Sequence, residues 1–135
     1  MDGNSAVKMN IFDSAEYAES LSECKKRKVG CALSAKGEVV SIGFNHSHGE
    51  ECSCQFGNEN PNVKHAEVSC LEHYEFIQGE YAEMAVTYMC CINCAKYIVK
   101  RHVNRVYIRD WRNDKTQGIE FLKLNNVEVL NEWKI

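Results

Sequence analysis

The chain has 135 residues, of which 44% are hydrophobic and 26% charged, an ordinary composition for one globular domain over residues 1–135. Its net charge of −3 argues against broad binding to duplex nucleic acid, which needs a basic face. No apolar run approaches the roughly 20 residues of a membrane span. Residues 1–10 also lack a basic segment followed by an apolar core, so we expect no secretory signal and a cytoplasmic protein, in the host cytoplasm if the source is viral. The eight cysteines are then expected as metal ligands or buried thiols, not disulfides.

Hydrophobic periodicity predicts helices alternating with short strands. A first helix is expected over 12–24, followed by a hairpin of strands 29–34 and 39–44 around Gly37. Residues 45–63 hold the only proline and are expected to form a long loop, a length that is often functional. The later elements are a helix from about 66, a strand at 83–88, a helix at 94–101, a strand at 103–108, a helix at 116–124 and a strand at 127–130. Because strands and helices alternate in this half, we expect parallel pairing there and a three-layer α/β/α fold with a five-stranded mixed sheet.

Two short motifs carry the chemistry. His65-Ala66-Glu67 is followed by Cys91-Ile92-Asn93-Cys94, the H-x-E and C-x-x-C pattern of zinc deaminases, except that Cys90 stands where proline is usual. Three protein ligands leave one tetrahedral position for water, which is typical of a catalytic zinc, and zinc lowers the pKa of that water to about 7. We expect His65, Cys91 and Cys94 to bind zinc and Glu67 to carry protons from the water to the ring nitrogen and the leaving ammonia.

A C-x-x-C motif by itself also occurs in redox proteins and in structural zinc ribbons. A redox motif usually follows a strand in a thioredoxin-like unit and needs no upstream H-x-E, whereas a structural zinc ribbon needs a second C-x-x-C. The chain has only a C-x-C at Cys52 and Cys54. A non-enzymatic zinc module would also gain nothing from the carboxylate of Glu67, so the sequence favours a catalytic zinc.

Over most of its length the chain resembles the cytidine deaminase superfamily, and within it the deoxycytidylate (dCMP) deaminases, particularly the small phage and viral forms. Besides the zinc motifs, the resemblance rests on four segments, Lys28-Val29-Gly30, residues 40–45, Cys94-Ala95-Lys96 and Val106-Tyr107. Deaminases of free nucleosides usually carry cysteine where this chain has His65, which favours the nucleotide branch. The resemblance implies a cytidine deaminase-like fold and zinc-dependent hydrolysis of dCMP to dUMP and ammonia, feeding thymidylate synthesis. Alternatives are a dCTP or dual dCMP/dCTP deaminase, or an editing deaminase of tRNA or single-stranded DNA, which should show a basic, aromatic-lined groove.

The resemblance also implies contacts with the substrate's sugar and base. Asn45 matches the asparagine that contacts the sugar 3′ hydroxyl, although an asparagine that merely begins a loop is the alternative. The backbone of Ala66 would bind the cytosine carbonyl, and the main chain near Met89 would accept from the amino group. Trp111 lies near the position of an aromatic residue beside the base and phosphate, with packing on its own loop as the alternative.

The basic run Lys25-Lys26-Arg27-Lys28 lies where relatives use an arginine for the substrate phosphate. Lys26 matches the family position more closely, whereas Arg27 offers two parallel donors to phosphate oxygens. A solvated charge run is the alternative for both residues.

The long loop departs from the family pattern, because His46-Ser47-His48-Gly49 follows Asn45 in place of a glycine-rich segment that binds allosteric nucleotides. Relatives are commonly hexamers activated by dCTP and inhibited by dTTP, so a homo-hexamer is implied, while regulation by these effectors stays open. Some phage relatives carry a second, structural zinc here, and reduced loop thiols are the alternative. The candidate ligands for that zinc are Cys24, His46, His48, Cys52 and Cys54. No nucleic-acid or membrane partner is expected.

Overall fold

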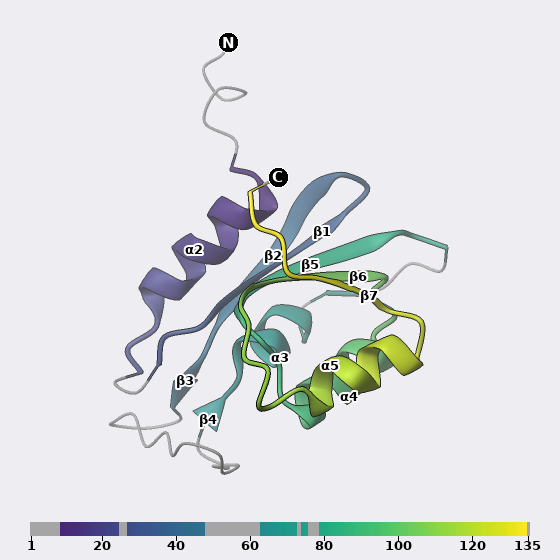
Figure 1. The fold of residues 1–135 in the computed structure, drawn as a ribbon. Helices are drawn as coiled ribbons and strands as arrows, with labels where there is room; N and C mark the ends of the chain where they lie inside the picture. Colours follow the sequence, from purple (N-terminus) through teal and green to yellow (C-terminus); the bar gives the residue numbers. More distant parts are fainter. Residues whose placement is uncertain (1–8, 25–26, 48–62, 73, 76–78, 135) are drawn as a thin grey trace.

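The computed structural model describes residues 9–24, 27–47, 63–72, 74–75 and 79–134. Within these ranges helices and strands alternate along the chain (Figure 1). The elements are α2 (Ile11–Leu21), β1 (Gly30–Ala35), β2 (Glu38–Phe44), β3 (His46–Ser47), β4 (Val63–Lys64), α3 (Ala66–Leu71), β5 (Ala82–Tyr88), α4 (Ile92–Lys100), β6 (Arg105–Asp110), α5 (Gln117–Leu124) and β7 (Glu128–Leu130).

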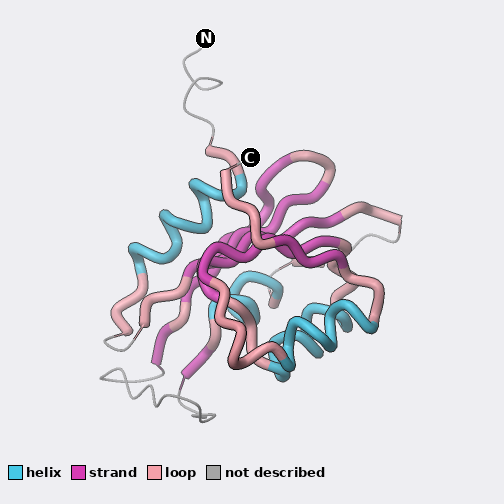
Figure 2. Tube along the Cα trace, viewed as in Figure 1, coloured by secondary structure: helices cyan, strands magenta, loops and turns pink. Residues whose placement is uncertain are grey.

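The main sheet has five strands in the order β2-β1-β5-β6-β7. Figure 2 draws the strands in magenta and the helices in cyan. β1 pairs antiparallel with β2 and with β5, whereas β6 runs parallel to both β5 and β7. The predicted five-stranded mixed sheet, with parallel pairing in the second half, is therefore confirmed. Since β5 and β6 are parallel and Tyr88 lies opposite Asp110, the segments that follow both strands leave from the same edge of the sheet.

Helices cover both faces of this sheet: α2 lies on one face, and α3, α4 and α5 lie on the other (Figure 1). Because successive side chains of a strand point to opposite faces of the sheet, the core consists of two clusters, one on each face. Ala32 and Ala85 face the α2 side with Phe12, while Leu33 and Met84 belong to the larger cluster on the other side. The small side chains beneath α2 let that helix lie close to the sheet, and the larger side chains fill the space beneath three helices.

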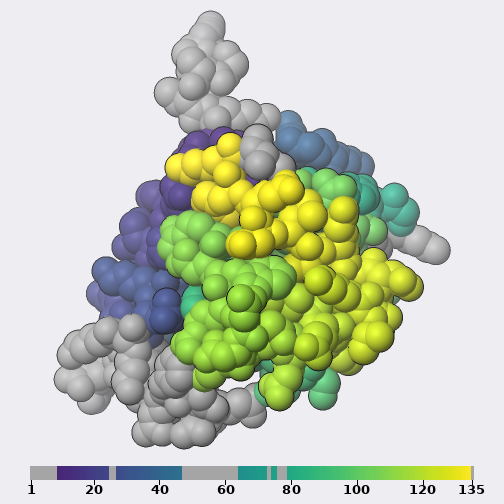
Figure 3. Space-filling view, in the orientation of Figure 1, coloured from purple at the N-terminus to yellow at the C-terminus, as the bar shows by residue number. Residues whose placement is uncertain are grey.

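The C-terminal segment lies against α2 (Figure 3). Trp133 packs edge-on against Phe12, with ring centroids 4.9 Å apart, and its Nε1 donates to Glu16 at 2.9 Å. Lys134 pairs with Asp13 and Glu16. These contacts fasten the chain's last described residues to the first helix.

The predicted order of elements is confirmed, but several predicted bounds are wrong. The helix expected at 94–101 is α4 at Ile92–Lys100, and the strand expected at 103–108 is β6 at Arg105–Asp110. α2 ends at Leu21 and not at residue 24, because Ser22 takes an extended conformation and its hydroxyl donates to Asn45. The prediction of a loop over 45–63 is wrong at both ends of that segment, where the short strands β3 and β4 pair antiparallel with His46 opposite Lys64. No helix in the described ranges combines the length and hydropathy that a membrane span requires.

Candidate active site

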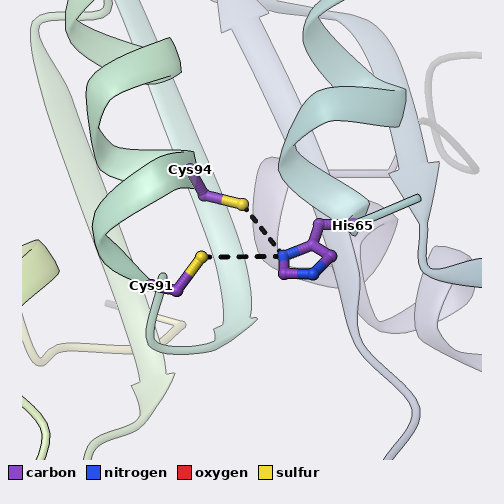
Figure 4. Close-up of side chains that lie close together, drawn as sticks. All are labelled: His65, Cys91 and Cys94. Atoms are coloured by element: carbon purple, nitrogen blue, oxygen red, sulfur yellow. Dashed lines mark hydrogen bonds between the residues drawn. The ribbon is translucent and has the colours of Figure 1, made fainter. Parts of the chain in front are cut away.

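Three ligand-type side chains meet at the starts of α3 and α4. His65 is the N-cap residue of α3, Cys91 is the N-cap residue of α4, and Cys94 lies in the first turn of α4. The Nδ1 atom of His65 lies 3.1 Å from the Sγ atom of Cys94 and 3.7 Å from that of Cys91 (Figure 4). All three ligand atoms lie within 4.8 Å of one another. The structure thus brings together the three side chains that the sequence predicted as metal ligands.

The donor set and its spacing fit zinc. Tetrahedral zinc with Zn–S bonds of about 2.3 Å and Zn–N bonds of about 2.0 Å holds its ligand atoms roughly 3.5–3.8 Å apart, close to the observed spacing. Two sulfurs and one imidazole nitrogen supply three of four positions. A fourth position left for a small molecule distinguishes a catalytic zinc site from a closed structural one.

At both helix starts the N-cap side chain is not used to cap the helix. An N-cap side chain normally accepts a hydrogen bond from a backbone N–H in the first turn. Neither His65 nor Cys91 makes such a bond, so the imidazole and the thiol point toward each other instead (Figure 4). The exposed N–H groups and the helix dipole favour negative charge at the start of α4, where the two thiols lie.

Two glycines fix where these helix starts lie. A Cβ atom on Gly43 of β2 would lie 2.3 Å from the backbone nitrogen of Cys70, so α3 packs directly on that strand. A Cβ atom on Gly118 of α5 would lie 2.4 Å from the carbonyl oxygen of Cys90 and 2.9 Å from the carbonyl carbon of Cys91. The segment that carries the cysteine ligands therefore rests against α5 with no room for a side chain between them.

The two cysteine ligands influence each other's ionisation. Hydrogen bonding from the Cys94 thiol, and then from His65, lowers the pKa of Cys91 to about 4. The same hydrogen bond raises the pKa of Cys94 well above its ordinary value, because it favours the protonated form of the donor. The pair therefore holds a thiolate at neutral pH, and a thiolate is the form that binds metal.

Glu67 lies in the first turn of α3, two residues after His65, and its side chain is buried. Burial raises its pKa to about 7, opposed by the nearby charge of His65. A carboxyl group with this pKa exists in both protonation states near neutral pH, which is the property required for accepting and returning a proton.

Asn45 is buried, and its side chain is already hydrogen bonded. Its Oδ1 accepts from the Ser22 hydroxyl at 2.7 Å and from the Val29 N–H at 2.9 Å, and its Nδ2 donates to the Arg27 carbonyl at 2.8 Å. These bonds orient the amide and tie the end of β2 to the segment before β1. The second N–H of the amide group can donate to a further acceptor such as a sugar oxygen.

The other residues predicted to contact the base lie at three places around the same edge of the sheet. Ala66 is buried as the first residue of α3. The N–H of Met89 donates to the Asp110 carbonyl, so of its main-chain groups the carbonyl is the one suited to accept from an amino group. Trp111 packs partly on the core, and its Nε1 donates to Asn113 at 2.9 Å. The indole N–H of Trp111 thus bonds within its own loop, while the contact of Trp111 with the base stays a prediction.

Of the two candidates for the phosphate, Arg27 is described and Lys26 lies outside the described residues. The Arg27 guanidinium carbon lies 4.1 Å from the centroid of the Tyr88 ring. Tyr88 carried no sequence signal, because nothing in the pattern shows that the segment before β1 crosses the end of β5.

The suggested second zinc falls largely outside the described residues, since His48, Cys52 and Cys54 are among those left out. Cys24 is buried, and the His46 ring lies against that of Phe44 with centroids 5.5 Å apart. Among the described residues, Cys24 and His46 do not join any group of three metal-binding side chains.

The fold and the site together define a class, an α/β/α protein with a Cys₂His group that can hold a metal ion beside a buried glutamate. Residues 6–109 match the family model described as the cytidine and deoxycytidylate deaminase zinc-binding region. The chain therefore belongs to the cytidine and deoxycytidylate deaminase family, and the resemblance inferred from sequence is confirmed.

Individual relatives agree with this assignment. The dCMP deaminase of the cyanophage S-TIM5, solved in complex with dCMP and dUMP, is 31% identical with a TM-score of 0.74, and the match covers 96% of this chain and 97% of that one. An uncharacterised deaminase in the luxG 3′ region of Aliivibrio fischeri is 26% identical over 77% of this chain and 73% of its own length. The tRNA-specific adenosine deaminase subunit tad2 of Schizosaccharomyces pombe is 29% identical over 68% of this chain, which spans only 22% of that protein.

Proposed function

We propose that this protein deaminates dCMP hydrolytically to dUMP and ammonia. The observation that carries the proposal is the meeting of His65, Cys91 and Cys94 beside the buried Glu67. Similarity over nearly the whole chain to a dCMP deaminase solved with dCMP and dUMP supports the choice of substrate.

In this proposal His65, Cys91 and Cys94 hold one zinc ion. Zinc bound there would supply a polarised water at neutral pH, the nucleophile that replaces the amino group. Glu67 takes one proton from the water and delivers it to the cytosine ring nitrogen; it then takes the second proton from the hydroxyl added to the ring carbon and delivers it to the amino group, which leaves as ammonia as the carbonyl forms. Its pKa of about 7 suits both the accepting and the donating steps, so no second acid is needed.

Asn45, Ala66 and Met89 are proposed to hold the nucleoside part of the substrate. The amide of Asn45 is oriented by its hydrogen bonds, and its second N–H would donate to the sugar 3′ hydroxyl. The backbone of Ala66 would donate to the cytosine carbonyl, and the Met89 carbonyl would accept from the amino group. Trp111 is the weaker candidate, because its Nε1 already donates to Asn113.

Two other substrates are alternatives to dCMP. The similarity to a tRNA-specific adenosine deaminase subunit makes editing of a nucleic-acid strand the second candidate, while the net charge of −3 is unfavourable for a polyanion. The triphosphate dCTP is the other, because it carries the same base and sugar.

The test is ammonia release by the zinc-loaded protein with dCMP, dCTP, deoxycytidine, a cytosine-containing single strand and tRNA. The proposal expects dCMP to have the highest kcat/KM. Glu67→Gln provides the matched control, because it keeps the ligands and removes the carboxylate. Activity restricted to the strand or the tRNA, or activity retained by Glu67→Gln, would contradict the proposal.

Assembly, location and metal count complete the proposal. We propose a cytoplasmic homo-hexamer, which light scattering of the zinc-loaded protein tests directly. Turnover of dCMP measured with added dCTP or dTTP then tests regulation by these effectors. Elemental analysis distinguishes one zinc per chain from two. If Cys24 binds a structural zinc, Cys24→Ser removes one equivalent and leaves the zinc held by His65 in place.

A further inference from the structure

Ser22 carries a buried hydroxyl that the proposed mechanism does not use. The residue follows the last residue of α2, and only 2% of its surface is exposed. Its Oγ atom lies 2.7 Å from the Asn45 Oδ1 atom and 2.9 Å from the Asn45 carbonyl oxygen. The hydroxyl therefore joins the end of α2 to the asparagine that follows β2, 23 residues further along the chain.

The direction of the Ser22 hydroxyl follows from its other neighbour. The Cys24 N–H donates to Ser22 Oγ at 3.2 Å. A hydroxyl that accepts one bond still has its single proton to donate, and the acceptors that the structure places beside it are the two oxygens of Asn45. Ser22 consequently acts as a donor to Asn45, and the shorter of its two contacts goes to the amide oxygen.

The bond from Ser22 completes the acceptor capacity of the Asn45 amide. An amide oxygen has two lone pairs. On Oδ1, one accepts from the Val29 N–H at 2.9 Å and the other accepts from the Ser22 hydroxyl. On Nδ2, one N–H donates to the Arg27 carbonyl at 2.8 Å. Within the described part of the chain, the second N–H is the amide group left to contact a ligand, and that ligand must then present an acceptor.

Asn45 lies next to the start of α3. A Cβ atom on Gly43, two residues earlier on the chain, would lie 2.6 Å from the Ala66 carbonyl oxygen. Ala66 stands between His65 and Glu67 in the sequence. Two residues of extended chain span about 7 Å, so Asn45 is close to the residues proposed to hold zinc and move protons. The sugar of a nucleotide bound at those residues is expected in the same neighbourhood.

We propose that Ser22 is a positioning residue for the substrate sugar. By donating to Oδ1, its hydroxyl holds the Asn45 amide in the orientation in which the second N–H meets the 3′ oxygen of the nucleotide. A hydrogen bond accepted at the amide oxygen also polarises the amide and makes that N–H a better donor. The inference rests on the proposed function and adds to it a residue that acts through Asn45 without touching the substrate.

The test compares nucleotides with and without the 3′ hydroxyl. Calorimetry measures the affinities of zinc-loaded wild type and Ser22→Ala for dUMP and for its 3′-deoxy analogue, ddUMP. Steady-state kinetics gives kcat and KM for dCMP and for the corresponding ddCMP. Melting temperature and zinc content show whether each variant folds and keeps its metal.

Two further variants complete the design. Ser22→Cys nearly keeps the size of the side chain but offers only a weak donor, so it decides the question if Ser22→Ala does not fold. Ser41→Ala is the matched control on β2, because it also removes a hydroxyl that donates to a backbone segment, in this case to the Cys70 carbonyl of α3 at 2.6 Å.

The expected result is selective for the 3′ hydroxyl. Ser22→Ala weakens binding of dUMP and raises KM for dCMP by about three- to tenfold, the size expected when one neutral hydrogen bond is weakened. Its kcat for dCMP stays within about twofold of wild type, because the lost contact is remote from the reacting atoms. For ddUMP and ddCMP, affinity and KM change by less than about twofold, because no bond to a 3′ oxygen remains to be weakened. Ser22→Cys shows a smaller loss of the same kind, and Ser41→Ala lowers the melting temperature without changing the preference for the 3′ hydroxyl.

Other outcomes separate this inference from the proposed function. If Ser22→Ala weakens binding of dUMP and ddUMP equally, or if wild type binds the two equally well, the positioning role is wrong and the deaminase proposal stands. If wild type does not deaminate dCMP but its preference for dUMP over ddUMP depends on Ser22, the positioning role stands and the proposed function fails. A zinc-loaded wild type that neither binds dUMP nor deaminates dCMP would overturn both.

Discussion

The start of α2 and the starts of α3 and α4 use their N-cap residues differently. At α2, the Asn10 side chain accepts a hydrogen bond from the Asp13 N–H at 2.8 Å. At α3 and α4, the N-cap residues His65 and Cys91 make no capping bond. Losing a cap costs about 1 kcal/mol of helix stability. α3 and α4 therefore lack a stabilising capping bond that α2 has. A bound metal would offset this loss, because metal binding stabilises the folded state.

The largest effect is expected from replacing a predicted metal ligand at a helix start with a residue that caps the helix. Serine is a good N-cap residue but a poor substitute for a zinc thiolate, so Cys91→Ser should cap α4 and disable the metal site. We expect zinc content to fall by one equivalent per chain and turnover of dCMP to become undetectable. The metal-free variant should melt at or above the temperature of metal-free wild type, as calorimetry would show.

A matched control for that variant is Cys70→Ala, which removes a buried thiol near the end of α3 that is not one of the three predicted ligands. It should lower the melting temperature and keep full zinc content. Stoichiometric zinc at the active site in Cys91→Ser would mean that Cys91 is not a ligand.

Glu67→Gln separates proton transfer from metal binding at the start of α3. The amide keeps the shape of the side chain but cannot exchange a proton, so kcat for dCMP should fall by about 10²–10⁴-fold, the usual contribution of general acid–base catalysis. Zinc content should equal that of wild type. Steady-state kinetics with elemental analysis on the same preparation measures both quantities, and a loss of kcat below tenfold would argue against the assigned role.

Gly118→Ala tests whether α5 fixes the start of α4. Because a Cβ atom there would lie 2.4 Å from the Cys90 carbonyl oxygen, the segment carrying the cysteine ligands must shift. We expect weaker zinc retention in a chelator competition and a lower kcat. Gly37→Ala is the control: it is strained at φ +80° but has no neighbour within 4 Å, so it should lower stability without changing zinc retention. Equal zinc retention in both variants would contradict the proposed support.

The smallest effect on stability and activity is expected from a substitution at the start of α2. Asn10→Ala removes the capping bond to the Asp13 N–H and should reduce the free energy of unfolding by about 1 kcal/mol. Zinc content and kcat/KM should not change, because α2 starts on the opposite side of the sheet from α3 and α4. A denaturant titration combined with the activity assay checks this, and a change in zinc content would show that the two regions are coupled.

The sequence predicted much of this molecule because its patterns are local. Hydrophobic periodicity gave all nine elements of the main fold in order, and the H-x-E and C-x-x-C spacing identified the three side chains that meet at 4.8 Å or less. The end of α2 was misjudged because Ser22 bonds to Asn45, 23 residues away, and no local pattern reports that contact.

The rest depended on how distant segments meet. Three contacts join segments that are far apart in the sequence: Gly118 with the Cys90 backbone, Arg27 with the Tyr88 ring, and the Arg112 N–H with the Met89 Sδ atom. The geometry of these contacts depends on strand order and helix packing. Those features follow from the whole sequence and not from any short pattern within it. The strands β3 and β4 were not predicted, because a strand of two residues shows almost no periodicity in the sequence.

The most direct test of the central claim is dUMP formation from dCMP while zinc is titrated into metal-free wild type and metal-free Glu67→Gln. The account predicts that the wild-type rate rises with zinc bound at His65, Cys91 and Cys94 and then reaches a plateau. Glu67→Gln should bind the same zinc and stay nearly inactive. A wild-type rate that does not depend on zinc, or a zinc-saturated wild type that forms no dUMP, would contradict it.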